Sequence, residues 1–223
     1  MLAVKVIAPG GPEQLAVAEV PTPVAGPGEI LVKVAAAGVN RADVLQRRGF
    51  YPPPPGASEL LGLEVSGTVA ELGKGVGKFN VGDPCVALLA GGGYAEYVSA
   101  PAGQVIAPPP GASMETAAGV VEVAATVVSN FAVLGLSDFH PSLTVLVHGG
   151  SGGVGSFAVQ YAKARGCRVI ATAGTPEKLE LCRKLGADLA IDYHEDWVAQ
   201  VKAEGGADLI LDVMGAKYLD SNV

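Results

Sequence analysis

The chain has 223 residues and a formal net charge of −7, from 22 Asp and Glu against 15 Lys and Arg, with a pI near 4.9. This acidic balance, without any basic run, argues against nucleic acid or an anionic membrane surface as a partner. The three cysteines are odd in number and form no C-x-x-C pair, so buried thiols in a reducing cytoplasm are expected.

Short β-branched runs separated by Gly and Pro fill the first half of the chain. The first residues already form a strand pattern, so no signal or transit peptide is expected. The composition changes at Pro108–Gly111, which places a domain boundary at 112/113. Over residues 1–112 the pattern predicts a small, mainly β domain with barrel-like closure. The expected strands are residues 3–7, 30–35, 65–71 and 85–89.

Residues 116–136 form a nearly continuous apolar stretch that has the length of a membrane span. Glu122 lies within it, and a carboxylate inside a bilayer costs about 3 kcal/mol, which the alanines and glycines do not offset. We therefore expect a helix buried between two domains rather than a span. Ser113 can cap its start, and Glu115 is favourably placed in its first turn.

Helical stretches and buried strands alternate over residues 113–223. The expected strands are residues 144–147, 168–172, 189–192 and 208–212. This order predicts a parallel sheet with helical crossovers, so the chain is assigned to the α/β class with a doubly wound second domain. A complete dinucleotide-binding sheet of this kind has six strands in the order 3-2-1-4-5-6, and only four are readable here. We expect the second domain to be incomplete at its C-terminal end.

A glycine-rich turn follows the strand at residues 144–147 and leads into a helix expected at residues 156–165. In a G-x-G-x-x-G spacing, the first glycine allows the tight turn, the second lets the backbone approach a pyrophosphate, and the third allows close helix–strand packing. A turn without a ligand is the simpler alternative. Because the start of a helix is rich in amide donors, the sequence predicts a dinucleotide phosphate at Gly150, Ser151, Gly152, Gly153, Val154 and Gly155.

The segment after the second strand of this half indicates which dinucleotide binds. A protein that prefers NAD carries Asp or Glu about 20 residues after the glycines, where it holds the ribose 2′-hydroxyl. Residues 171–176 hold no carboxylate; instead Gly174, Thr175 and Lys178 offer space, a hydroxyl and a cation that suit a 2′-phosphate. Ordinary roles remain open, because Thr175 is also a good helix N-cap and Lys178 an ordinary surface lysine. The predicted cofactor is NADP(H).

Further motifs lie in the first half. They are Gly62-Leu-Glu-Val-Ser-Gly67-Thr-Val69 with Gly73, Val76, Phe79 and Gly82-Asp83, and also Asn40-Arg-Ala-Asp43 and Gly49-Phe-Tyr51. With the glycine turn, they resemble the quinone oxidoreductases of the medium-chain dehydrogenase/reductase superfamily, specifically the zinc-free, zeta-crystallin-like members and, within those, the tumour-suppressor-inducible branch. The resemblance implies a GroES-like catalytic domain beside a Rossmann domain, with substrate and nicotinamide in the cleft between them, and homodimers among full-length relatives.

The resemblance assigns roles to further residues. Asn40 is a candidate hydrogen-bond donor to the substrate oxygen, and Tyr51 a candidate donor that can relay a proton. Each has a structural alternative: a helix N-cap for Asn40, and a loop aromatic packed on prolines for Tyr51. Thr126 resembles a nicotinamide-side threonine, with a bond to its own helix as the alternative, and Tyr193 resembles an aromatic beside the adenine ribose phosphate. Glu64 belongs to the motif and is expected to be structural.

Zinc alcohol dehydrogenases have a ligand Cys where this chain has Asn40 and a ligand His where it has Leu63. The chain also lacks a run of four clustered cysteines, and His140, His148 and His194 have no partners at ligand spacing. No metal is expected. Hydride chemistry then depends on the cofactor, while the protein supplies position and polarisation.

The sequence therefore predicts NADPH-dependent reduction of quinones or related conjugated carbonyls, such as enones, by hydride transfer without metal. A catalytically silent NADP(H)-binding protein, or a truncated isoform, is the alternative that the small number of readable strands favours. The expected partner is a small-molecule quinone or enone, with neither nucleic acid nor membrane.

Overall fold

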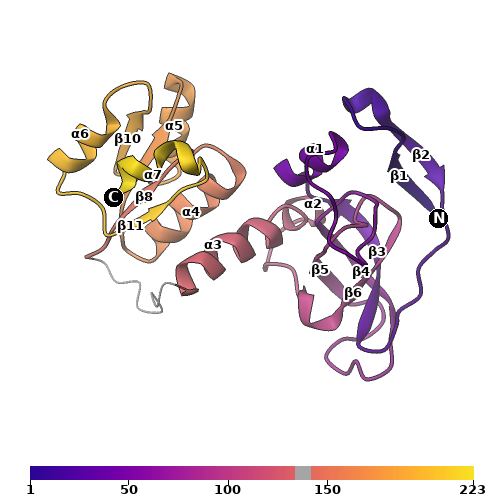
Figure 1. Ribbon diagram of the computed structural model, residues 1–223. Coiled ribbons are helices and arrows are strands. Elements are labelled where there is room, and N and C mark those ends of the chain that lie inside the picture. The colour runs from indigo at the N-terminus through magenta and orange to yellow at the C-terminus, as the bar shows by residue number, and fades with distance from the viewer. Residues whose placement is uncertain (134–141) are drawn as a thin grey trace. The chain divides into compact units, whose positions relative to one another are not determined.

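The computed structural model describes residues 1–133 and 142–223 (Figure 1). Contacts within the chain divide it into two compact units, Met1–Glu122 and Val123–Val223, and each is described by itself. The division falls within helix α3 (Val121–Val133). The domain boundary at 112/113 stays a prediction.

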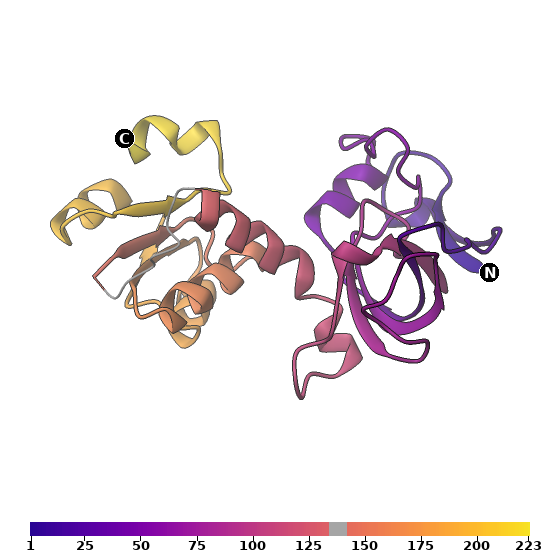
Figure 2. The same cartoon turned by 90° about the horizontal axis from the view of Figure 1, so that it is seen from below.

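A five-stranded antiparallel sheet in the order β6-β3-β4-β5-β7 is the main element of the first unit. The register of the two long central strands shifts between Leu31 and Val32 and again between Val34 and Ala36. Such bulges bend a strand and increase its twist, and Figure 2 shows the sheet curled into a half-barrel. The strands are β3 (Glu29–Ala37), β4 (Glu64–Leu72), β5 (Pro84–Leu88), β6 (Tyr97–Pro101) and β7 (Val105–Ile106).

The core of the first unit lies inside this half-barrel. Alternate residues of the central strands point inwards, so Ile30 and Val32 of β3 and Val65 of β4 are fully buried. Cys85 of β5 is part of the same cluster, and burial raises the pKa of its thiol to about 11. All three cysteines of the chain are buried and form no disulfide, which confirms the sequence-based prediction of buried thiols.

A hairpin and short helices complete the first unit. The hairpin pairs β1 (Leu2–Val6) with β2 (Leu15–Glu19). Asn40 is the N-cap of α1 (Arg41–Arg47), and Ser113 caps α2 (Met114–Ala117), its Oγ accepting the N–H of Thr116 at 3.2 Å, so both predicted caps are confirmed. Single 3-10 turns occupy Pro12–Gln14 and Ala102–Gln104.

The apolar stretch that the sequence assigned to one helix forms two. The first, α2, ends at Ala117, and α3 begins at Val121, with the poor helix former Gly119 in the break. Most α3 side chains described are half-buried or exposed within the structure. Burial of this helix between two domains stays a prediction. Residues 134–136 lie outside the described residues. Within the described part of the chain, no helix is long and apolar enough to cross a membrane.

A four-stranded parallel sheet in the order β10-β9-β8-β11 forms the centre of the second unit. Counted along the chain, this order is the 3-2-1-4 part of the predicted six-stranded dinucleotide-binding sheet. Strands β8 and β10 have the predicted bounds, while β9 ends one residue later and β11 is shorter at both ends. The strands are β8 (Thr144–Val147), β9 (Arg168–Ala173), β10 (Leu189–Asp192) and β11 (Leu209–Leu211).

Both faces of this sheet are covered, which is why its strands are apolar at successive positions. Val145 and Val147 of β8 face a cluster completed by α3, α4 (Gly153–Ala164) and α5 (Pro176–Lys184). Leu146 faces the opposite cluster, which includes Trp197 of α6 (Trp197–Ala203) and Tyr218 of α7 (Ala216–Asn222). The second unit is therefore a three-layer α/β arrangement.

Candidate functional site

The candidate cofactor residues of the second unit gather at one edge of its sheet. Because β8, β9 and β10 run parallel, their carboxyl ends meet at the same edge. Gly150–Gly155 follow β8, Gly174 and Thr175 follow β9, and Tyr193 follows β10. Ligands of open parallel sheets bind outside this edge. The structure thus brings the glycine turn and the candidate 2′-phosphate residues together.

The three glycines of the motif are not equally required by the fold. A side chain on Gly150 would approach Cβ of Ala171 to 2.8 Å. One on Gly155 would approach Cα of Gly150 to 2.8 Å and overlap the carbonyl oxygen of Gly149. At Gly152 the nearest atom, the Gly149 oxygen, would be 3.4 Å away, and φ of −77° suits any residue. Packing therefore explains the outer two glycines, and the open face of Gly152 is available to a ligand.

Helix α4 begins at this turn with Gly152 as its N-cap, and in the described structure no side chain caps it. The first turn of a helix leaves its N–H groups without intrahelical acceptors, here those of Gly153, Val154 and Gly155. Gly152 and Gly153 are exposed and Ser151 is half-buried. The positive end of the helix dipole adds to these donors. The turn can therefore bind a phosphate group.

Thr175 is the N-cap of α5, and its Oγ accepts the backbone N–H of Lys178 at 3.3 Å. The N-cap alternative for Thr175 is thereby confirmed. The first turn of α5 also contains the carboxylate of Glu177. Hydrogen bonds from the backbone N–H of Glu177 and from the Thr175 hydroxyl lower the pKa of this carboxyl group. Lys178 is exposed. A role for Thr175 and Lys178 in binding a 2′-phosphate stays a prediction.

Gly174 and Tyr193 lie against each other. A Cβ on Gly174 would overlap the phenol of Tyr193, so the tyrosine ring occupies the space that the missing side chain leaves. The Tyr193 ring also lies 4.5 Å from the ring of His194. Gly174 is thus needed for the position of Tyr193. Thr126 lies on α3, where its carbonyl accepts the Asn130 amide at 2.7 Å, and its nicotinamide-side role stays a prediction.

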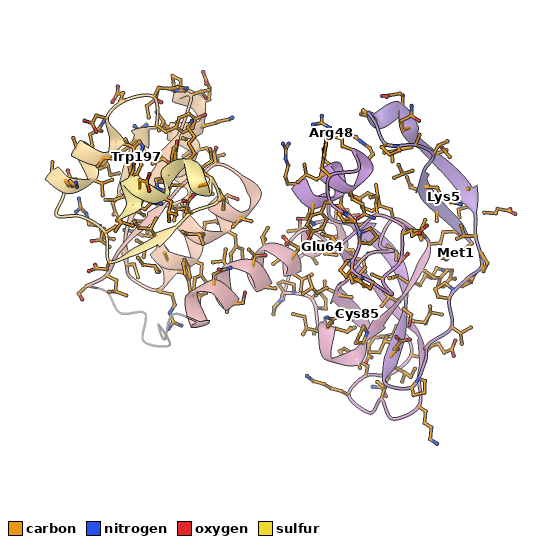
Figure 3. All side chains as sticks on the ribbon, in the orientation of Figure 1. Met1, Lys5, Arg48, Glu64, Cys85 and Trp197 are labelled. Carbon is orange, nitrogen blue, oxygen red and sulfur yellow. The ribbon has the colours of Figure 1, made fainter. Side chains whose placement is uncertain are left out.

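In the first unit, Asn40 is held by two buried carboxylates. Its side-chain Nδ2 donates to Oε1 of Glu64 at 2.9 Å, and its backbone N–H donates to Oδ2 of Asp43 at 2.8 Å. Both acids are only 2% exposed, and Glu64, labelled in Figure 3, lies inside the first unit. The other oxygen of Glu64 accepts the backbone N–H of Glu122 at 3.0 Å. Asn40 therefore has a fixed orientation.

Asp43 is the centre of this network. Its Oδ1 accepts the backbone N–H of Gly62 at 3.0 Å, and its Oδ2 also accepts the hydroxyl of Tyr94 at 3.1 Å. Burial, and then the Asp43 carboxylate, raise the pKa of Tyr94 well above its usual range, so the phenol stays protonated and donates. Burial likewise raises the pKa of Glu64, against the opposing effect of its two N–H donors.

Tyr51 lies in the loop after α1 and is 45% exposed. It lines a cavity of about 260 Å³ together with Gln46, Leu63, Leu88 and Glu122. Apolar walls with a few polar groups are typical of small-molecule sites. In the described residues no hydrogen bond joins Tyr51 to Asn40. The roles of both residues toward a substrate stay predictions.

Two family models match the chain: "Alcohol dehydrogenase GroES-like domain" over residues 26–110 and "Zinc-binding dehydrogenase" over residues 153–223. A quinone oxidoreductase of Pseudomonas aeruginosa is 37% identical over 193 residues, 86% of this chain and 58% of its own length. A trans-enoyl reductase of Aspergillus terreus is 35% identical over 210 residues, 85% of this chain and 56% of its own. The chain thus spans less than two thirds of the length of these two curated relatives.

A mycobacterial protein solved in complex with NADPH is 36% identical, with a TM-score of 0.85 over 100% of this chain and 70% of that one. The chain belongs to the quinone oxidoreductase-like proteins of the medium-chain dehydrogenase/reductase superfamily. The predicted fold, a GroES-like domain followed by a Rossmann-like parallel sheet, is thereby confirmed. The superfamily membership implied by the sequence motifs is confirmed with it.

Two contacts of this site have no signal in the sequence. Glu64, which is expected to be structural, accepts the Asn40 amide, and Tyr94 donates to the Asp43 side chain. Both contacts join residues at least 24 positions apart in the sequence, so no local sequence pattern predicts them. Among the described residues, no group of three or more His, Cys, Asp and Glu is placed to hold a metal ion. His194 bonds its neighbour Asp192, and His140 lies outside the described residues.

Proposed function

We propose that this chain binds NADPH at its glycine turn and reduces quinones or related conjugated carbonyls by hydride transfer without a metal. The observation that carries the proposal is the open face of Gly152, which the fold leaves without a side chain although its packing tolerates one. The NADPH complex of the mycobacterial relative supports the choice of cofactor. The quinone oxidoreductase and trans-enoyl reductase relatives support the substrate class.

The residues of the second unit fit the parts of NADPH. The amides at the start of α4 suit the pyrophosphate, since they point donors and a positive dipole end at an anion. Thr175 and Lys178, at the start of α5, would hold the 2′-phosphate, because that turn offers a cation and a second helix N-terminus. Thr126 is assigned to the nicotinamide side and Tyr193 to the adenine ribose phosphate.

NADPH, when bound, supplies the hydride. The oxygen of a quinone or enone gains negative charge as it is reduced, so a fixed hydrogen-bond donor stabilises the transition state. The Nδ2 of Asn40 carries two hydrogens, and Glu64 accepts one of them. We assign the second hydrogen to the substrate oxygen. Tyr51 supplies a hydroxyl at the wall of a cavity and is assigned to proton donation.

The metal-free part of the proposal rests on donor chemistry. Asn40 presents an amide N–H where zinc relatives have a thiolate, and that amide already donates to Glu64. Leu63, which stands where those relatives have a ligand His, lines the cavity with an apolar side chain. The carboxylate of Asp43 is fully engaged by N–H and O–H donors. These side chains suit a site that polarises by hydrogen bonds. The sequence motifs of the first half support assigning the chain to the zinc-free, tumour-suppressor-inducible branch, as part of this proposal.

The decisive experiment is steady-state NADPH oxidation by the chain with matched ortho-quinones, para-quinones, enones and enoyl thioesters. We expect turnover with quinones that survives exhaustive chelation. NADPH binding without turnover of any acceptor would favour the alternative, a catalytically silent NADP(H)-binding protein. Turnover of enoyl thioesters alone would favour the activity named for the Aspergillus relative. Activity that chelation removes and zinc restores would contradict the metal-free mechanism.

A further inference from the structure

A buried chain of hydrogen bonds connects α7 with the glycine turn of the second unit. His148 directly follows β8 and is 0% exposed. Its Nδ1 lies 3.1 Å from Oγ1 of Thr172, and its Nε2 lies 3.0 Å from Oδ1 of Asn222 on α7. Thr172 is also 0% exposed. Both His148 and Thr172 are therefore shielded from water in the folded unit.

The partners fix the tautomer of His148. The Nδ2 of Asn222 donates to the carboxylate of Asp212 at 2.9 Å, so the amide oxygen of Asn222 faces His148 and must accept. Nε2 of His148 therefore carries the hydrogen. Burial lowers the pKa of His148, so the ring is neutral and its Nδ1 accepts the hydroxyl hydrogen of Thr172.

The chain of bonds ends on the cofactor turn. Oγ1 of Thr172 accepts the backbone N–H of Gly149 at 3.3 Å, and the carbonyl of Thr172 accepts the N–H of Gly150 at 2.9 Å. The carbonyl of Gly149 in turn accepts the N–H of Gly152 at 2.9 Å. Every donor points the same way, from Gly149 toward the carboxylate of Asp212. Bonds aligned in this manner polarise and strengthen one another.

We infer that His148 and Asn222 are positioning residues for the cofactor-binding turn, so that docking of α7 and binding of NADPH stabilise each other. The inference rests on the proposed function for its ligand. Neither residue touches the open face of Gly152, so both act through Thr172 and Gly149. Coupling of this kind is reciprocal. If docking of α7 increases the affinity for NADPH, then bound NADPH stabilises the docked α7 by the same free energy.

Three variants replace one polar side chain of the chain of bonds by an apolar one of similar shape, and each removes two hydrogen bonds: Thr172→Val, His148→Phe and Asn222→Leu. We expect each to raise the Kd for NADPH by about 3- to 10-fold, the range for one or two hydrogen bonds in such a chain. The control is Val201→Ala, which truncates a residue of the same apolar cluster but lies off the hydrogen-bond chain. It should lower the melting temperature and leave the Kd for NADPH unchanged.

Amide hydrogen exchange tests the inference both without and with the cofactor. In the unliganded chain, exchange at Gly149 and Gly150 should be faster in Asn222→Leu than in the parent and unchanged in Val201→Ala. When NADPH is added, exchange over residues 216–222 should slow in the parent but not in His148→Phe. Trp197, the single tryptophan, lies 4.7 Å from the His148 ring and reports by its emission whether that pocket is intact.

Equal exchange at Gly149 in the parent and Asn222→Leu would overturn the inference, as would a rise in Kd for Val201→Ala as large as for His148→Phe. If the parent chain does not bind NADPH but exchange at Gly149 is still faster in Asn222→Leu than in the parent, the proposed function is contradicted and the positioning role is supported. The two failures are therefore distinguishable.

Discussion

The side-chain amide of Asn40 donates to Oε1 of Glu64 at 2.9 Å, and the opposite carboxylate oxygen accepts the backbone N–H of Glu122 at 3.0 Å. Gly38 makes this contact possible, because a Cβ at that position would overlap the Glu64 carboxylate. Both partners of Glu64 are donors, and each uses a different carboxylate oxygen. The carboxylate thus joins the start of α1 to the start of α3 and orients the proposed donor.

Replacing Glu64 with Gln tests this relationship. A carboxamide has one acceptor oxygen, so one of the two N–H donors loses its bond, at a cost of about 1–3 kcal/mol in the free energy of unfolding. If Asn40 loses its partner, kcat for quinone reduction falls more than KM changes. Urea unfolding and steady-state kinetics measure the two effects. A Glu64→Gln variant with parental stability and parental kcat would contradict the positioning role.

The pH dependence of stability has a predicted sign. Burial raises the pKa of Glu64 in the folded chain above its unfolded value. The stability from this group is therefore fully present below the unfolded pKa, near pH 4, and is lost as the pH rises through the raised value. The free energy of unfolding of the parent, minus that of Glu64→Gln, should fall as the pH rises above about 4. A difference that stays constant or grows over this range would contradict the assigned shift.

Two substitutions at Asn40 separate its structural role from its proposed catalytic role. Serine retains an N-cap oxygen for α1 but has no amide donor, whereas alanine lacks both. Both variants lose the bond to Glu64, so we expect each to lose about 1–3 kcal/mol of stability and about 10²-fold in kcat. Asn40→Ala should lose about 1 kcal/mol more, because it also lacks the cap. Thermal melts and quinone kinetics on both variants provide the test. Parental kcat in Asn40→Ser would remove Asn40 from the mechanism.

The parts of this molecule that could be predicted from sequence are those set by local pattern. The parallel strands show as short apolar runs, and the caps at Asn40, Ser113 and Thr175 depend on a few neighbouring residues. The turn between α2 and α3 could not be predicted in this way, because a nearly continuous apolar composition indicates a single helix. The glycine turn was found because its three glycines keep a fixed local spacing.

The contacts that could not be predicted join distant segments. Glu64 meets Asn40 across 24 residues, and His148 meets Asn222 across 74. Nothing near either residue in the sequence marks its partner, because the pairing is decided by the order of strands in each sheet. The alternation of burial on β8 also assigns Leu146 and His148 to one face, which is where α7 packs. That face can be worked out only after the sheet order is known.

Cofactor preference is predicted to depend on Lys178. Replacing it with Ala removes the exposed cation at the start of α5, so the Kd for NADPH should rise by about 3- to 10-fold while that for NADH stays constant. Lys184→Ala is the matched control, since this lysine lies at the far end of the same helix, 3.9 Å from Glu180. Fluorescence titration with both cofactors measures the change. Equal affinity of the parent for NADPH and NADH would contradict the 2′-phosphate assignment.

The glycines of the turn are predicted to differ in how much stability is lost when each is substituted. An added methyl group on Gly155 must displace the backbone at Gly149 and Gly150, so Gly155→Ala should lose about 1–3 kcal/mol of stability. Gly103→Ala is the control, because no atom lies within 4 Å of its added Cβ. Thermal unfolding compares the two. Parental stability of Gly155→Ala would show that close packing of this turn is not required.

Equilibrium titration of NADPH against the parent chain and Gly152→Val tests the central claim most directly. An added Cβ at Gly152 comes no closer than 3.4 Å to its nearest neighbour, so the variant should stay folded and keep the parental far-ultraviolet circular dichroism spectrum. Its affinity for NADPH should collapse, because the branched side chain fills the place where the pyrophosphate approaches the backbone. A Gly152→Val chain that binds NADPH with parental affinity would contradict the account and place the cofactor elsewhere.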